Sequence, residues 1–585
     1  MTQSSELPRK NKSNLNVLAA ILVAMAALLL TPVFFKGCFT KQQRDKTKAQ
    51  VQIIEESKAK TDNLRKAMRF LNQLTPVTRE NYIKEVQLEL NTWLKGLDQS
   101  GAEFSPPRLL RDFPQDLLVA VECENPLSLR FGYWDVDYLF EQCLMNDLSA
   151  WITQFDLRDN LIAPMVKAHQ EQLSPADGMK LEEACKLFDW TIRNVAMDGA
   201  TSSVDQLSDN PSQLGNGTLG CNYLPWECLL FSAADFVERG RVFSALATQR
   251  GIDTCWIATK PSEGPGKLWA VGALIGEQIY VFEPKLGIPV LDPDKPALAT
   301  LQDALKNERV LRRLDLPGQF EYALDQEQIQ SFQFLVDAPP SSATARMKIL
   351  QESLLGAERM VTYRDVDALA NRLTGLFPEA PVSLWLVPAL AQVNAAEVRE
   401  MLRTTNPNAM RYLAMHGVWL SENPAANGRI LHLKGQFENT DDGQGALTMY
   451  IETRIDNERL EKIMYDPDVQ REFGIVRPVT DTDEQFEARL RQAQMIFGRA
   501  KIDASFLLAE LHYDRGNYSE SMAFITRVLN DDRAAYWHNG CYYLLGRIYQ
   551  EQDELAKATE ALTRPMPQEP GNRLRLRYLQ RESAK

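Results

Sequence analysis

Residues suited to metal and redox chemistry are scarce in this sequence of 585 residues. It has eight cysteines but no Cys-x-x-Cys pair, so it offers neither the ligand spacing of a structural zinc site nor a disulfide framework. Its five histidines are far apart, and none lies between His169 and His416. Isolated histidines without acidic neighbours at ligand spacing do not make a metal site. We therefore predict no bound metal and no cofactor.

Clustered positive charge is missing from most of the chain. The formal net charge is −13, although residues 1–60 carry ten Lys or Arg against four Asp or Glu, so the remainder is strongly acidic. Binding to phosphate groups needs clustered positive charge. The charge distribution therefore argues against nucleic acid as the main partner. A composition of 44% hydrophobic and 24% charged residues is that of a globular chain with room for several cores.

Only one long apolar run is present, from Val17 to Phe35. Its nineteen residues carry no charge, and at a rise of about 1.5 Å per residue they would cross the ~30 Å hydrocarbon layer of a bilayer. A cleaved signal peptide would need a small-residue cleavage site, which the sequence after Phe35 does not supply. We therefore predict a single-pass membrane protein, with a tail and transmembrane anchor in residues 1–40. The flanking Lys and Arg leave the side of the membrane open.

The order of helical and strand-like patterns predicts a multidomain α+β fold. Residues 41–100 are charged and helix-forming, and their apolar seam lasts under two heptads, which predicts a solvated helical stalk. Residues 115–185 read as a helical lead-in to a central domain. Within it, Asp135 and Asp137 stand at i and i+2 and would point to different sides of a helix, so we expect a solvated helix start there.

Residues 299–425 alternate between helical and strand-like patterns. Strands are predicted over residues 331–336 and 382–387, and helices over residues 342–355 and 364–377. The alternation is typical of an α/β region. It contains no phosphate-binding loop and no nucleophile elbow, so the pattern predicts no chemistry for this region.

The most informative stretch lies within residues 115–298. A helix over residues 187–195 is followed by a loop rich in Gly, Ser and Asn and by a second helix from Phe236 to Arg250. Three short apolar runs come next, at residues 254–258, 268–275 and 278–282. Helices followed by apolar runs of period two predict a small antiparallel sheet packed on a helix.

These residues resemble the transglutaminase-like family of papain-type cysteine enzymes. Asp189-Trp190-Thr191-Ile192-Arg193-Asn194-Val195 matches the family's tryptophan-containing helix, and Gly251-Ile252 matches the end of its second helix. Counting back from Gly251 places Glu238 and Gly240 on the family's acidic and small positions. The same count places Phe236 where the family has its nucleophilic cysteine.

The resemblance implies a fold without the reaction. The family's histidine position falls on Leu268, while Glu283-Pro284 fits its Asp-Pro position. A thiolate nucleophile needs an imidazole base and a group that orients the base. Phe236 and Leu268 provide neither, so we predict no catalytic residue. We expect these two side chains to pack together, and Glu283 to face solvent or to pair with a base such as Arg239.

A relocated nucleophile is the alternative. Cys221 and Cys228 lie just upstream of the second helix, and their base would have to come from outside the domain, as His416 or His432. A cysteine hydrolase or acyl transferase, of protease or transglutaminase type, would result. The other interpretation is that these cysteines are small buried apolar residues, and the same applies to Cys255.

Residues 426–585 resemble tetratricopeptide repeats. The pattern of residues 508–521 recurs in residues 545–558, with a degenerate hairpin at residues 433–450 and a capping helix after Gly571. Small residues in such repeats let paired helices approach closely. The two resemblances imply a membrane-anchored, non-catalytic scaffold that binds an unknown protein or peptide partner through the repeats.

Overall fold

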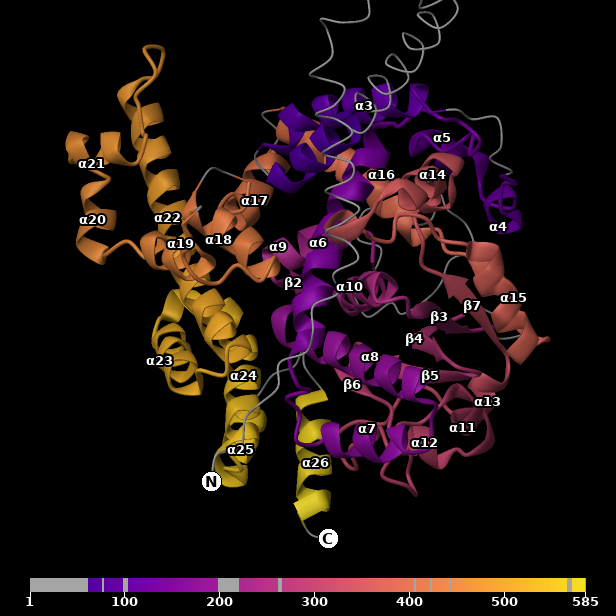
Figure 1. Ribbon diagram of the computed structural model, residues 1–585. Helices are drawn as coiled ribbons and strands as arrows, with labels where there is room; N and C mark the ends of the chain where they lie inside the picture. Colours follow the sequence, from indigo (N-terminus) through magenta and orange to yellow (C-terminus); the bar gives the residue numbers. More distant parts are fainter. Residues whose placement is uncertain are drawn as a thin grey trace, which may run out of the picture. The chain divides into compact units, whose positions relative to one another are not determined.

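The computed structural model describes residues 62–75, 78–97, 104–197, 220–260, 266–404, 407–420, 423–441, 443–564 and 571–583. The residues from Leu64 onward belong to one compact unit, which is the unit described below (Figure 1). Within the described ranges the fold is a mixed α+β arrangement in which helices predominate.

The predicted apolar runs form the middle of a sheet with the strand order β6-β5-β4-β3-β7-β8. The strands are β3 (Asp253–Thr259), β4 (Leu268–Ile275), β5 (Gln278–Glu283), β6 (Ile288–Pro289), β7 (Phe332–Val336) and β8 (Val382–Leu384). Neighbours pair antiparallel except β7 and β8, which are parallel. Gly276, with a φ of 60°, lies in the two-residue turn between β4 and β5, where such turns need positive φ. Pro289 lies in the edge strand β6, the place where a sheet tolerates proline.

Two helices of the central stretch pack on this sheet and on each other. They are α8 (Pro175–Asn194) and α10 (Phe236–Gln249), which cover the predicted helices. α10 approaches β3 closely at Gly240, where a Cβ atom would lie 2.3 Å from the Trp256 ring. A short parallel pair, β1 (Ala196–Met197) and β2 (Ala233–Ala234), joins the end of α8 to the chain before α10.

The described residues of the predicted stalk, 62–75 and 78–97, belong to the same core, so a solvated stalk is wrong for them. Residues 41–61 of the predicted stalk lie outside the described residues. Leu64, Met68 and Leu71 of the helical residues 62–73 are all buried. The heptad-like positions are therefore core positions that face other parts of the chain. The helices that follow are α3 (Arg79–Lys95), α4 (Arg108–Arg111), α5 (Gln115–Ala120), α6 (Tyr133–Gln154), α7 (Ala163–Gln170) and, after α8, α9 (Pro225–Phe231).

The prediction of a separate α/β region at residues 299–425 is wrong, because its strands do not form a layer of their own. Its strands β7 and β8 extend the central sheet, because β7 pairs directly with β3. Their apolar residues thus share the core of the central domain. The helices of this part are α11 (Leu301–Lys306), α12 (Arg309–Arg312), α13 (Gln326–Gln330), α14 (Ala345–Ser353), α15 (Val366–Leu376), α16 (Val387–Leu402) and α17 (Pro407–His416).

The C-terminal part is helical, and α22 packs on α23 as α24 packs on α25. One buried cluster of apolar side chains extends from Leu64 to Leu579 and includes part of the C-terminal helices. Two further clusters belong to the C-terminal helices alone, one around Phe506, Ile525 and Trp537 and one formed by Leu460, Ile463 and Leu490. The helices are α18 (Pro424–Leu433), α19 (Ala446–Thr453), α20 (Asn457–Lys462), α21 (Pro467–Glu472), α22 (Asp483–Asp514), α23 (Tyr518–Leu529), α24 (His538–Glu551), α25 (Leu555–Leu562) and α26 (Gly571–Ser583).

The predicted transmembrane helix and single-pass membrane localisation are corrected. Within the described ranges, none of the helices combines the length and the apolar composition needed to cross a bilayer. The 32-residue α22 has the length, but charged residues recur along it. The predicted span, residues 17–35, lies outside the described residues.

Close packing of α24 on α25 makes Gly546 sensitive to added bulk. A Cβ atom there would lie 2.6 Å from both Cγ and Cδ2 of Leu562. Gly546→Leu should therefore lower the free energy of unfolding by about 1–3 kcal/mol, measured by chemical denaturation. Gly498→Leu in α22 is the matched control, because no atom lies within 4 Å of its Cβ position. Equal stability of the two variants would contradict this packing.

Candidate functional site

Phe236, which the predicted resemblance aligns with the family's nucleophile, is buried in the structure. Phe236 is the first residue of α10, as predicted, and only 4% of its surface is exposed. Asp235 caps the helix by accepting a hydrogen bond from the Glu238 amide at 2.8 Å, and Glu238 accepts one from the Asp235 amide at 3.1 Å. The Lys285 ammonium lies 5.3 Å from the centre of the Phe236 ring. The helix N-terminus is thus closed by its own side chains and has no nucleophile at its first residue.

Leu268 and Glu283 are the residues that the predicted resemblance aligns with the family's base and its orienting group, and neither is a histidine. Leu268 opens β4 and pairs with Ala258 of β3, whereas the contact expected between Leu268 and Phe236 stays a prediction. Glu283 ends β5 and is 1% exposed, so it does not face solvent, and its expected pairing with a base such as Arg239 stays a prediction. Its carboxylate accepts a hydrogen bond from the Lys285 amide at 2.9 Å, because the chain turns back directly after the strand. The Arg239 guanidinium donates to backbone carbonyls, including that of Val195 at 2.8 Å.

The candidate relocated nucleophiles are enclosed in the core. Cys221 and Cys228 are both buried, and so is Cys255. Burial raises the pKa of the Cys221 thiol to about 12 and raises that of Cys228 well above its usual value, because a thiolate is poorly solvated there. In the described part of the chain, neither Cys221 nor Cys228 is hydrogen-bonded to a histidine. Both thiols are therefore protonated at neutral pH, and burial opposes the thiolate that a nucleophile needs.

The two candidate histidine bases have other partners. His416 Nε2 lies 3.2 Å from the Tyr223 hydroxyl, and burial lowers the pKa of His416 to about 4. His432 is fully buried and lies 3.4 Å from an Asp514 oxygen. Burial is also the main cause that lowers the pKa of His432. Among the residues placed by the structure, no group of His, Cys, Asp and Glu is arranged to hold a metal ion.

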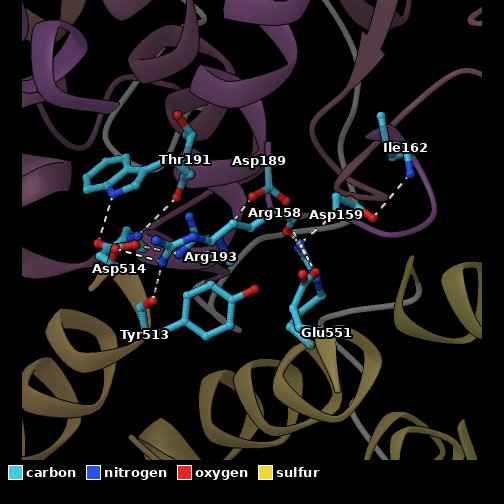
Figure 2. Close-up of polar contacts among 12 residues, drawn as sticks. Arg158, Asp159, Ile162, Asp189, Thr191, Arg193, Tyr513, Asp514 and Glu551 are labelled. Atoms are coloured by element: carbon cyan, nitrogen blue, oxygen red, sulfur yellow. Dashed lines mark hydrogen bonds and ion pairs between the residues drawn. The ribbon is translucent and has the colours of Figure 1, made fainter. Parts of the chain in front are cut away.

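The polar residues of the tryptophan-containing helix α8 meet the C-terminal helices. The Trp190 indole donates to Asp514 of α22 at 3.0 Å, and Arg193 donates to the same carboxylate at 2.8 Å. Asp189 accepts from Arg193 at 3.1 Å and from Arg547 of α24 at 2.6 Å. Figure 2 shows Arg193 between Asp189 and Asp514. We call Asp159, Asp189, Arg193, Asp514, Arg547 and Arg575 the docking network.

The other half of the docking network centres on Asp159, which precedes α7. Arg575 of α26 donates to both carboxylate oxygens of Asp159, at 3.0 and 2.9 Å, and an Arg547 nitrogen lies 3.7 Å away. Burial alone would raise the pKa of Asp159, but these two guanidinium groups hold it below its usual value. In the same way Arg193 and His432 hold the pKa of the buried Asp514 at about 2. The carboxylates of Asp159 and Asp514 are thus charged, and each is paired with at least one arginine.

Asp135 and Asp137 are buried, which corrects the predicted solvated helix start. They are 1% and 3% exposed in α6. Asp135 accepts from Arg346 at 2.6 and 2.9 Å, and Asp137 forms an ion pair with Arg79. Their side chains do point to different partners, as i and i+2 spacing requires. Arginines from distant parts of the chain replace the water that the sequence alone suggested.

A second polar centre lies between α6 and α10, around a cavity of about 40 Å³ that is large enough for ordered water. Its lining includes Glu141, Arg241 and Asp337. The Arg241 guanidinium lies 3.6 Å from Asp337. Burial raises the pKa of Glu141 to about 8, and the charges of Asp137 and Asp337 add to the increase, whereas Arg241 opposes it. Glu141 is thus largely protonated at neutral pH.

The sequence predicts the helices and strands of the central stretch but not the docking network. The sequence predicts Asp189, Trp190 and Arg193 only as part of a resemblance and predicts none of their contacts with α22 and α24. The one signal in the sequence is that Asp189 and Arg193 stand among the apolar residues of this helix, since polar groups that become buried need partners. No protein-family model, curated protein or solved structure matches the chain.

Proposed function

We propose that the chain is a non-catalytic protein that binds a protein or peptide partner. The observation that carries this proposal is the buried Phe236 ring at the first residue of α10, where the transglutaminase-like family has its nucleophile. A side chain without a nucleophilic atom, next to a helix start that is capped by Asp235 and Glu238, has no means to attack an amide. We include in this proposal that the central domain is transglutaminase-like and that the C-terminal helices are tetratricopeptide-like.

The docking network supports a binding role for the C-terminal helices. Arg547 and Arg575 tie α24 and α26 to Asp159, and Arg193 ties α22 to α8. A helical array that is fixed on a rigid domain loses little conformational freedom when it binds a partner, which favours affinity. The helices that resemble repeats thus have the preorganised framework that a scaffold needs.

The reactivity of the cysteines tests the non-catalytic part of the proposal. In the folded chain, the seven cysteines of the described ranges should react with a chromogenic disulfide reagent far more slowly than in denaturant, because all seven are buried. Mass spectrometry assigns the rate to each residue. Faster labelling of Cys221 or Cys228 than of a free thiol at neutral pH would show an activated nucleophile and would contradict the proposal.

A further inference from the structure

An open groove lies where α18 and α19 meet the end of the first described helix. Its volume is about 520 Å³, which is within the usual range for ligand sites. The groove is lined by residues 72–75, by Asp147 of α6, and by residues of α18 and α19 and of the loop between them. It is separate from the Phe236 position and from the docking network, so neither of those sites accounts for it.

The floor of the groove is aliphatic. Leu74 and Ile430 are buried there, and Leu431 and Met449 are partly buried. The lining residues include no aromatic ring, so a nucleic-acid base would have no side chain on which to stack. A floor of this kind fits small aliphatic side chains.

Four side-chain carboxamides surround this floor. Asn72, Gln73, Asn427 and Gln436 line the groove, and all four are exposed. None of these four amide groups is hydrogen-bonded to another residue of the described ranges. Each carboxamide offers a carbonyl acceptor and two N–H donors. The rim of the groove is therefore rich in neutral groups that can donate and accept at once.

The groove is lined by one basic and one acidic residue. Lys434 and Asp147 both line it, and the Lys434 ammonium donates to the backbone carbonyl of Asn72 at 2.8 Å. Burial raises the pKa of Asp147, and the nearby Lys434 opposes this increase. A strongly charged ligand would leave one of these groups opposed by a like charge. The lining thus favours an uncharged ligand.

We propose that this groove binds an extended, uncharged peptide segment of a partner protein, with small aliphatic side chains on the floor. The backbone of such a segment presents one N–H and one C=O at each residue, and a carboxamide can pair with both. A helical ligand pairs these groups internally and leaves none for the rim. The assignment rests on the proposed binding function and names the site and the ligand class.

The test uses the full chain and a library of random linear peptides displayed on phage. Peptides selected on the wild-type chain are synthesised, and their affinity is measured by titration against Asn427→Asp and Gln436→Glu. Each substitution keeps the shape, removes two N–H donors and adds a negative charge that repels peptide carbonyls. We expect each to weaken binding by about tenfold, which corresponds to about 1.4 kcal/mol. Both side chains are exposed, so the unfolding midpoint should not change.

Gln552→Glu is the matched control, because Gln552 is an exposed carboxamide outside the groove. It should leave peptide affinity unchanged. If the selected peptides bind Asn427→Asp and Gln436→Glu as tightly as the wild type, the assignment of this groove as the peptide site is wrong, while the proposed binding function stands. Failure to select any peptide would also contradict the assignment of the groove as a peptide-binding site. Dimerisation of the chain that the two groove variants abolish would make a second copy the occupant and would overturn the peptide assignment. Amide turnover by the chain would instead contradict the proposed function.

Discussion

Replacing Arg547 with Met should lower the free energy of unfolding by about 3–5 kcal/mol, the largest effect expected of any single substitution considered for this chain. The Arg547 side chain is fully buried and donates to Asp189 at 2.6 Å and to the Arg158 carbonyl at 2.6 Å. Its removal leaves the carboxylates of Asp189 and Asp159 with less compensation in a medium that solvates charge poorly. Chemical denaturation of the full chain measures the loss.

Arg533→Met is the control for this prediction. Arg533 pairs with Asp531 at 2.8 Å, but 59% of its side chain is exposed. An exposed ion pair contributes only about 0–1 kcal/mol, because water solvates both charges in the unfolded and the folded chain. If Arg547→Met costs no more than Arg533→Met, the docking network does not hold the C-terminal helices on α8.

The second large effect is a dependence of stability on pH that comes from Glu141. The pKa of this buried carboxyl is raised from 4.5 to about 8, chiefly by burial. Between these values the folded chain holds a proton that the unfolded chain has released, so stability falls as pH rises. One such proton changes the free energy of unfolding by about 1.4 kcal/mol per pH unit. This loss of unfolding free energy is absent below about pH 4.5 and reaches its full size above about pH 8.

Glu141→Gln keeps the size of the side chain and removes the titrating group. Denaturation at a series of pH values between 5 and 8 should then show a slope that is shallower by about one proton. Glu227, whose pKa burial raises to about 7, continues to contribute to the slope of the variant. Glu458→Gln changes an exposed carboxyl on α20 and should keep the wild-type slope. An unchanged slope in Glu141→Gln would show that Glu141 is ionised in the folded chain.

Local patterns in the sequence predicted the central elements well, because each depends on neighbouring residues. The continuous run without polar residues from Leu268 to Ile275 is a property of one strand, and β4 has these limits. The start of α10 at Phe236 follows from the capping residues Asp235 and Glu238. Gly251 ends the same region with a φ of 66°, a conformation that favours glycine.

The docking network could not be predicted, because its partners are distant in sequence. Arg547 and Asp189 are separated by 358 positions, and the pairing exists only once α24 lies against α8. The same limit led to the wrong expectation for Asp137, whose partner Arg79 lies on another helix. The prediction of a solvated stalk fails for the described residues 62–75 and 78–97 for a related reason. An apolar seam shows that one face of a helix is buried, but it does not show which part of the chain covers that face.

Turnover of amide substrates by the full chain tests the central claim most directly. Hydrolysis and transamidation of a glutamine-containing peptide are measured for the wild type and for the double variant Cys221→Ala/Cys228→Ala. We predict no turnover above the uncatalysed rate for either protein, because Phe236 stands where the proposed resemblance has its nucleophile and neither buried thiol is hydrogen-bonded to an imidazole of the described residues. Turnover by the wild type that disappears in the double variant would contradict the account and would identify a relocated nucleophile.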